Sequence, residues 1–186
     1  MLARFYELTA KIDAFFDRVH ARHATDMRCA AGCDLCCRAR LTVTRIEAAA
    51  IVAWARMRSA EERAVIAHAA AASSGEPSDD TGLPRCSALD DAGRCRIYDA
   101  RPVVCRSHGV PVRMKDARSL PVVTSCELNF TARGPGAADA DCILDQELIS
   151  TMLGLLDRAY AAETESETER VELADLLAAL ADADHE

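Results

Sequence analysis

Four cysteines fall within nine residues of this chain, in the segment CAAGCDLCC at residues 29–37, and this block constrains the fold more than any other feature. The first twenty residues interrupt their apolar positions with charged ones, so they lack the continuous apolar stretch of a secretory signal. We therefore expect a cytoplasmic protein, where clustered thiols are typically metal ligands or redox groups rather than disulfides. Five further cysteines follow the block, at Cys86, Cys95, Cys105, Cys126 and Cys142.

The spacing C-x3-C-x2-C places three thiolates on a tight turn containing Gly32, and such a turn can wrap one face of a metal ion or an iron–sulfur cluster. We expect the side chains of the adjacent Cys36 and Cys37 to diverge, so that they serve two neighbouring centres, or one ligates while the other supports it. Eight cysteines are the number that two four-thiolate sites require. The predicted metal ligands are Cys29, Cys33, Cys36, Cys37, Cys86, Cys95, Cys105 and Cys126.

The remaining cysteine and the histidines are interpreted differently. Cys142 stands at the start of a predicted helix, away from the turn signals, and we expect a buried thiol without a ligand role. His108 follows Cys105 at C-x2-H spacing and is interpreted as a surface or supporting histidine, with direct ligation as the alternative. His20 and His23 fall at the predicted end of the first helix, where a cation suits the helix dipole, and no chemistry is assigned to them.

Hydrophobic periodicity predicts helices over residues 3–22, 45–57 and 60–73, and another from about residue 141. Capping-box pairs at Thr44/Glu47 and Ser59/Glu62 are expected to open the second and third helices. A third box at Ser166/Glu169 is expected to open a last helix. The composition of residues 73–85 favours a linker or surface loop.

Two short β-type runs, VPVRM and LPVVT, predict a small hairpin, and Pro111 and Pro121 restrict its strands to sheet edges. The predicted fold class is mainly α, with helices enclosing irregular cysteine-rich metal-binding loops and one short β-hairpin. The expected segments are an N-terminal helix (1–26), a cysteine-cluster domain (27–130), a packing helix (131–162) and an acidic helical tail (163–186).

The net charge of −8 is concentrated in residues 163–186, which hold nine acidic residues and one arginine. We expect this tail to be a solvated helix, with docking to a basic partner as the alternative. The rest of the chain has no net charge and lacks the excess of basic residues typical of nucleic-acid-binding domains, so no nucleic-acid partner is expected. No apolar run approaches the length of a membrane helix, so no membrane association is expected. Arginines adjoin several cysteines, and they either compensate thiolate charge or belong to a solvated surface.

The cysteine pattern resembles the YkgJ-like family of CxxCxxCC proteins, described as a zinc- or iron-chelating domain. The resemblance covers about residues 27–130 and rests on CAAGCDLCC, on Cys86, on GRCRIYDARPVVCR at residues 93–106, and on Cys126. It implies a metal or iron–sulfur site, with no single reaction, and Cys142 is an addition to the family pattern. Within the motif, Pro102 is expected to present Cys105 from a rigid segment, and Tyr98 is interpreted as a core residue, with shielding of the site as the alternative.

Two functions remain open from the sequence. The favoured one is an iron–sulfur protein that acts in electron transfer or as an accessory to a modification pathway, with a protein or redox partner. The alternative is a zinc-binding structural or interaction protein with two four-cysteine sites. Enzyme activity stays undecided, between an iron–sulfur oxidoreductase and a component of a modification enzyme. The C-x3-C-x2-C spacing matches that of radical S-adenosylmethionine enzymes, but the alternating strands of their partial βα barrel are not predicted. No Ser/His/Asp set, phosphate-binding glycine loop or H-E-x-x-H helix appears.

Overall fold

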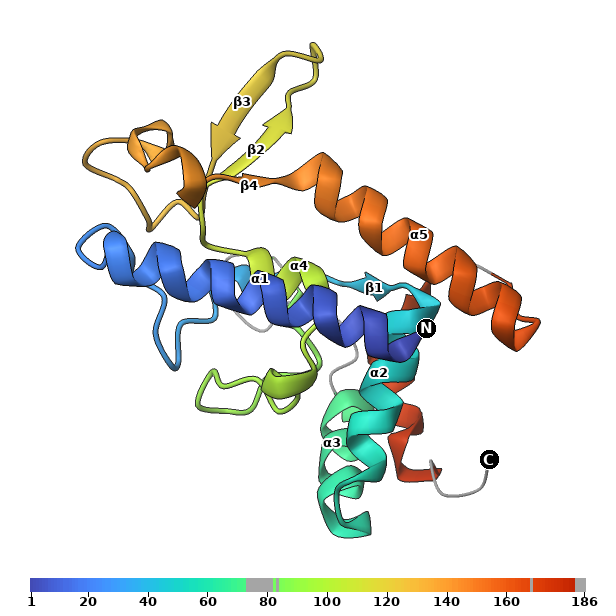
Figure 1. The fold of residues 1–186 in the computed structure, drawn as a ribbon. Helices are drawn as coiled ribbons and strands as arrows, with labels where there is room; N and C mark the ends of the chain where they lie inside the picture. The colour runs from blue at the N-terminus through green and yellow to red at the C-terminus, as the bar shows by residue number, and fades with distance from the viewer. Residues whose placement is uncertain (73–81, 83, 168, 183–186) are drawn as a thin grey trace. The chain divides into compact units, whose positions relative to one another are not determined.

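The computed structural model describes residues 1–72, 82, 84–167 and 169–182 (Figure 1). The chain forms two compact units. Unit 1 holds Met1 and residues 3–30 and 103–158, and unit 2 holds Leu2 and residues 31–102 and 159–186. Each unit therefore combines segments that are far apart in the sequence, whereas the sequence analysis divides the chain into consecutive segments. The predicted loop at residues 73–85 lies largely outside the described residues.

Helix α1 (Leu2–Arg22) confirms the first predicted helix. Its apolar residues recur every three or four positions, and Phe5, Leu8, Ile12 and Val19 are buried as this spacing requires. The helix ends at His23, whose backbone N–H donates to the Val19 carbonyl at 2.8 Å. The end of α1 therefore sets the position of the His23 side chain.

The predicted hairpin is present in unit 1, as β2 (Val112–Lys115) paired antiparallel with β3 (Pro121–Thr124). Its strands run side by side in Figure 1. A third strand, β4 (Leu144–Asp145), pairs parallel with β2 and gives the strand order β3-β2-β4. The prediction that both strands lie at an edge is wrong for β2, because Pro111 precedes the strand and leaves its donors available on both sides.

Two further helices contribute to unit 1. The short α4 (Val103–Ser107) follows Pro102 directly, which is a favourable place for proline because the first helical turn needs no N–H donors. Helix α5 (Gln146–Thr164) begins five residues later than predicted. Residues 140–142 instead form the 3₁₀ turn η4 (Ala140–Cys142), and the Asp145 carboxylate accepts a hydrogen bond from the Leu148 N–H at 3.0 Å at the start of α5.

Helices α2 (Arg45–Arg56) and α3 (Ala60–Ala72) in unit 2 confirm the next two predicted helices. Both predicted capping boxes form: Thr44 with Glu47, and Ser59 with Glu62. Each box satisfies backbone donors that the helix itself leaves without partners. The break between the two helices falls at residues 57–59, where the sequence also separates the two predicted helices.

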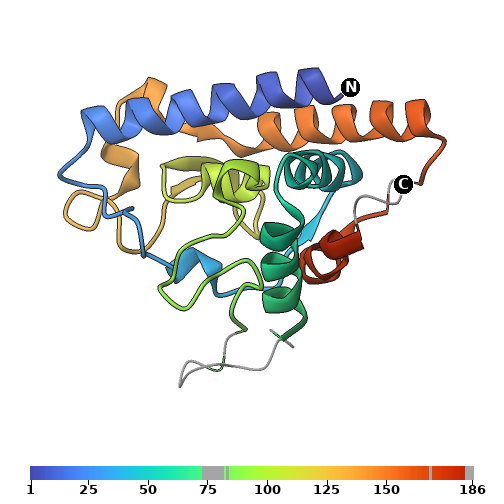
Figure 2. The same cartoon turned by 90° about the horizontal axis from the view of Figure 1, so that it is seen from below.

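The acidic C-terminal segment differs from the prediction. Residues 165–167 and 169–170 are not helical, so the third capping box is wrong, and β5 (Val171–Glu172) instead pairs antiparallel with β1 (Thr42–Val43). Helix α6 (Leu173–Ala178) and η5 (Ala179–Asp182) follow and pack against α3 (Figure 2). Leu173, Leu177 and Leu180 are buried in the hydrophobic core of unit 2, so this segment is not merely solvated.

The predicted fold class, mainly α with one short hairpin, is confirmed. The remaining described elements are short 3₁₀ turns: η1 (Leu35–Cys37), η2 (Tyr98–Ala100) and η3 (Pro135–Ala137). Within the described part of the chain, none of the helices has the length and apolar character needed to cross a membrane.

Candidate metal centre

Cys36 and Cys37 lie together on the turn η1 in unit 2, and their sulfur atoms are 3.9 Å apart. The expectation that these side chains diverge is therefore wrong. Two sulfurs bound to one tetrahedral ion, at metal–sulfur bonds of about 2.3 Å, are themselves separated by about 3.8 Å. The observed separation suits two thiolates that share one centre.

Cys86 and Cys95 lie on a second stretch of unit 2 that is joined to η1. The Cys86 N–H donates to the Cys37 carbonyl at 2.8 Å, and Leu89 and Cys95 form an isolated antiparallel bridge. Both thiols pack against the hydrophobic core of unit 2. A methyl group on Gly93 would lie 3.1 Å from the Gly32 carbonyl oxygen, so the two cysteine-bearing turns approach closely at these glycines.

Electrostatics separate the thiols of unit 2 into two kinds. The pKa of the Cys36 thiol is lowered to about 7, first by the hydrogen bond with Cys37 and in smaller part by the positive charge of Arg101. Burial raises the pKa of both Cys86 and Cys95, and a negative charge on Cys36 raises them further. The thiols of Cys36, Cys86 and Cys95 therefore interact with one another, and Cys36 is the one most readily ionised without a metal.

Arg101 acts on two of these thiols, because its charge lowers the pKa of both Cys36 and Cys95, and Arg85 acts in the same way on Cys86. The Arg101 guanidinium lies 3.7 Å from the centre of the Tyr98 ring, which holds it by a cation–π contact. Tyr98 is 57% exposed, so its interpretation as a core residue is wrong.

Several arginines that adjoin cysteines have carboxylate partners instead. Arg38 pairs with Asp34 and Arg94 with Asp90 in unit 2, and Arg106 pairs with Asp13 in unit 1. Sequence adjacency to a cysteine therefore identifies Arg85, whose charge lowers the pKa of Cys86, but it does not identify Arg101.

Cys29 is the best defined of the predicted ligands in unit 1. The Asn129 side-chain amide donates to the Cys29 sulfur at 3.3 Å and to the Gly109 carbonyl at 2.8 Å, while its oxygen accepts from the Arg28 N–H at 2.7 Å. Asn129 is buried, with 3% of its surface exposed. An N–H donor directed at sulfur stabilises the thiolate, which is the form that binds metals.

Cys126 and Cys105 belong to the same unit. The Asn129 N–H donates to the Cys126 carbonyl at 2.9 Å, so one residue connects the backbone of Cys126 to the thiol of Cys29. Cys105 is carried by α4. Cys126, His108 and Gly109 line a hollow of about 260 Å³ next to the end of α4. His108 is exposed there, as expected, and its alternative role as a ligand stays a prediction.

The structure gathers the predicted ligands into two groups. Unit 2 brings together Cys36, Cys37, Cys86 and Cys95 and carries Cys33 exposed on the preceding turn, whereas unit 1 holds Cys29, Cys105 and Cys126. All nine cysteines are free thiols. Within either unit, no three of these eight sulfurs lie mutually within 4.8 Å in the described chain. The eight-cysteine ligand set stays a prediction that requires the sulfurs to close around a bound ion.

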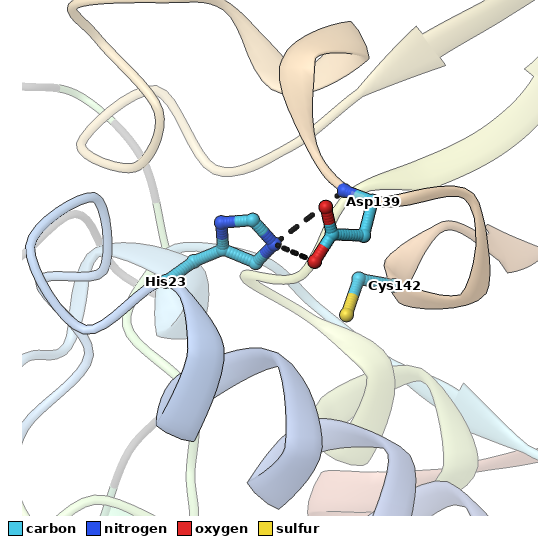
Figure 3. A group of neighbouring side chains, drawn as sticks. All are labelled: His23, Asp139 and Cys142. Atoms are coloured by element: carbon cyan, nitrogen blue, oxygen red, sulfur yellow. Dashed lines mark hydrogen bonds and ion pairs between the residues drawn. The ribbon is translucent and has the colours of Figure 1, made fainter.

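A different group of potential ligands was missed by the sequence reasoning. His23, Asp139 and Cys142, all in unit 1, place one ligand atom each within 4.8 Å of one another (Figure 3). Cys142 is fully buried, as expected, but its neighbours are a histidine and a carboxylate. The spacing of Asp139 and Cys142, three residues apart across a 3₁₀ turn, is a signal that could have been noticed. Asn129 was also missed, and only its C-x2-N spacing to Cys126 points to it.

Comparison with known proteins gives one match. The family model described as "CxxCxxCC: Putative zinc- or iron-chelating domain" matches residues 28–127, just over half of the chain. The matched stretch contains all eight predicted ligands and ends before Asp139 and Cys142. No curated protein and no solved structure matches the chain.

Proposed function

The chain belongs to the CxxCxxCC family of zinc- or iron-chelating domains, and from that premise we propose that its thiols hold an iron–sulfur cluster used in electron transfer or in a redox step that supports a modification pathway. The observation that carries this proposal is the group of four thiols in unit 2, where Cys36 and Cys37 lie 3.9 Å apart beside Cys86 and Cys95. Iron–sulfur clusters are typically held by four cysteine thiolates.

The surroundings of this group suit a cluster in two ways. Thiolate ligands add negative charge, and Arg101 supplies a positive charge that acts on Cys36 and Cys95. Cys33 and Cys36 are exposed while Cys86 and Cys95 are half-buried, so a cluster here would lie at the surface of unit 2. A redox partner protein needs such a surface position, because electron transfer requires close approach.

In unit 1, Cys29, Cys105 and Cys126 supply three further thiols. The amide of Asn129 would orient Cys29 and donate to its sulfur when a metal is bound. We propose that these three thiols complete the protein's cysteine ligand set for iron.

Zinc binding is the second candidate, and a separate observation favours it. Cys86 and Cys95 pack against the hydrophobic core formed by α2, α3 and α6, where a four-thiolate zinc ion would join the cysteine-bearing turns to the helices. Structural zinc sites stabilise small domains in this manner. The protein would then act through its surface on a protein partner, without redox chemistry.

An anaerobic preparation distinguishes the two proposals. Absorption spectra recorded before and after reduction, together with analysis of iron, sulfide and zinc, measure what the purified full chain contains. Iron with a matching amount of sulfide, and a visible absorption that bleaches on reduction, would support the cluster. Colourless protein that holds zinc and no sulfide would overturn it in favour of the second candidate.

Single substitutions assign the ligands. Cys36→Ser, Cys86→Ser, Cys33→Ser and Cys105→Ser are each expected to lower the iron and sulfide content. Cys142→Ser is the matched control, because it removes a buried thiol outside the family match and is expected to leave iron and sulfide unchanged. Any of the first four variants that retains full iron and sulfide content is removed from the ligand set.

A further inference from the structure

We propose that unit 1 contains a second, separate metal site formed by His23, Asp139 and Cys142, which takes a divalent ion of zinc-like character. This site lies outside the residues that match the family, and none of the eight cysteines of the family pattern belongs to it. The proposal rests on the positions, burial and charges of these three side chains (Figure 3).

Three local backbone features bring the ligands together. His23 is the residue that ends α1, while Asp139 and Cys142 flank and close the 3₁₀ turn η4. The Cys142 N–H donates to the Asp139 carbonyl at 2.8 Å. Because a 3₁₀ turn has about three residues per turn, side chains three positions apart project from the same face. Asp139 and Cys142 therefore face His23 from one side of η4.

Burial makes the histidine unusual. His23 is 7% exposed, and its Nε2 atom accepts a hydrogen bond from the Asp139 N–H at 3.5 Å and lies 3.6 Å from the Asp139 carboxylate. Both separations are long for hydrogen bonds, whose usual N···O distance is about 2.9 Å. The His23 ring also contacts the Phe130 ring, with ring centres 5.4 Å apart and the two planes tilted by 56°. Among the described residues, the printed polar contacts of this buried imidazole are these two long ones, so a metal ion that binds Nε2 displaces only one weak hydrogen bond.

The two nearby arginines make their short contacts with Asp141, which leaves the Asp139 carboxylate available to bind a metal ion. Arg22 makes its short contacts, at 2.8 Å, with both carboxylate oxygens of Asp141, and its distance to the Asp139 carboxylate is 3.7 Å. Arg18 donates to the Asp141 carbonyl at 3.0 Å and pairs with the Asp141 carboxylate. A neutral imidazole, a carboxylate and a thiolate carry two negative charges, which match one divalent cation. Binding would release the proton of the Cys142 thiol to the solvent.

The ligand types point to zinc rather than magnesium or calcium. Imidazole nitrogen and thiolate sulfur are ligands of zinc and similar ions, whereas magnesium and calcium prefer oxygen. Ligand atoms around a tetrahedral zinc lie about 3.3–3.8 Å apart. The three ligand atoms here lie within 4.8 Å of one another, so they need to move closer together by about 1 Å to bind zinc. The Asp139 side chain is 58% exposed and can make this movement, and its exposed side leaves room for water as a fourth ligand.

Zinc binding to the full chain tests the proposal with two matched substitutions. Asp139→Ala removes an exposed ligand whose side chain makes no capping hydrogen bond on η4. Asp141→Ala removes the neighbouring exposed carboxylate, which makes the short contacts with Arg22 and does not belong to the proposed ligand set. After dialysis against zinc, we expect Asp139→Ala to hold one zinc per chain less than the unsubstituted protein, and Asp141→Ala to hold the same amount. Equal zinc content in Asp139→Ala and the unsubstituted protein, or an equal loss in Asp141→Ala, would overturn the proposal.

Two further measurements keep this result separate from the family site. Iron and sulfide content are expected to be unchanged in Asp139→Ala, so failure of the iron–sulfur proposal does not affect the comparison. Cys142→Ala is expected to lose the same single zinc, with far-ultraviolet circular dichroism showing that its helices remain. If folded Cys142→Ala retains that zinc, the proposed ligand set is refuted.

Discussion

Gly109→Ala provides the sharpest test of how unit 1 positions Cys29. Gly109 has φ of +99°, and an added methyl group would lie 2.7 Å from the Cys29 sulfur and 3.3 Å from the Asn129 amide nitrogen. Ordinary van der Waals contact begins at about 3.4 Å, so the sulfur would have to retreat by about 0.7 Å. Metal–ligand distances are held within about 0.2 Å, so this displacement is expected to lower metal content.

The cost in stability has two parts. A left-handed backbone costs a non-glycine residue about 1–2 kcal/mol, and forcing a methyl group into a filled site costs about 1–3 kcal/mol. Gly109→Ala is therefore expected to lower the free energy of unfolding by about 2–5 kcal/mol. Gly134→Ala is the matched control, because Gly134 also has a positive φ, of +75°, but has nothing within 4 Å of the added methyl group. Because ψ of Gly134 is 155°, a region that is essentially restricted to glycine, Gly134→Ala is expected to cost about 1–3 kcal/mol from the backbone alone and to leave the metal content unchanged.

Denaturant unfolding of the metal-free, reduced protein, followed by circular dichroism, measures both costs, and elemental analysis of the loaded protein measures the metal. Only Gly109→Ala is expected to show both the larger destabilisation and the loss of metal. Equal stability and equal metal content in the two variants would refute the placement of Cys29 against Gly109.

Three other substitutions test the remaining features. Asn129→Asp replaces the N–H donor to the Cys29 sulfur with a carboxylate, so metal content is expected to fall and stability to drop by about 1–3 kcal/mol. Arg101→Gln removes a positive charge that acts on Cys36; the pKa of that thiol should rise from about 7, and its alkylation rate at pH 7 in metal-free protein should fall. Leu177→Ala removes a fully buried side chain of α6 and is expected to cost about 2–5 kcal/mol in denaturant unfolding.

Each of these has a matched control. Glu127→Gln alters an exposed residue near Asn129 and should leave metal content unchanged. Arg94→Gln removes an exposed arginine that pairs with Asp90, so the alkylation rate of Cys36 should not change. Leu155→Ala truncates an exposed leucine and should cost less than about 0.5 kcal/mol. A control that behaves like its partner contradicts the assigned contact.

The helices that could be predicted are those determined by local sequence. The boxes at Thr44/Glu47 and Ser59/Glu62 use residues three apart, and both form in the structure. The box at Ser166/Glu169 has the same pattern but does not open a helix, because Val171 and Glu172 pair with a strand at residues 42–43. Pairing across about 130 residues leaves no trace in a local window, and it decides the structure of the C-terminal segment.

The candidate site, like the fold, could be predicted from local sequence only in part. Spacing identified the cysteines as a ligand set, and the family match covers all eight. The 3.9 Å separation of Cys36 and Cys37 depends on how a 3₁₀ turn orients neighbouring side chains, and the sequence does not contain that information. Asn129 and Asp139 contact Cys29 and His23 from about 100 residues away, so only the folded chain reveals them.

Asn129 and Phe130 connect the two groups of candidate ligands in unit 1. The Asn129 side chain holds Cys29, while the adjacent Phe130 ring packs against His23. Phe130 has φ of +56°, which costs a non-glycine residue about 1–3 kcal/mol and persists only where its surroundings compensate. Here the ring is 99% buried, and the Phe130 N–H donates to the Asp26 carbonyl at 2.8 Å. The left-handed backbone at Phe130 lets two consecutive residues contact different candidate ligands. Asn129 donates a hydrogen bond to the Cys29 sulfur, and Phe130 makes an aromatic contact with the His23 imidazole.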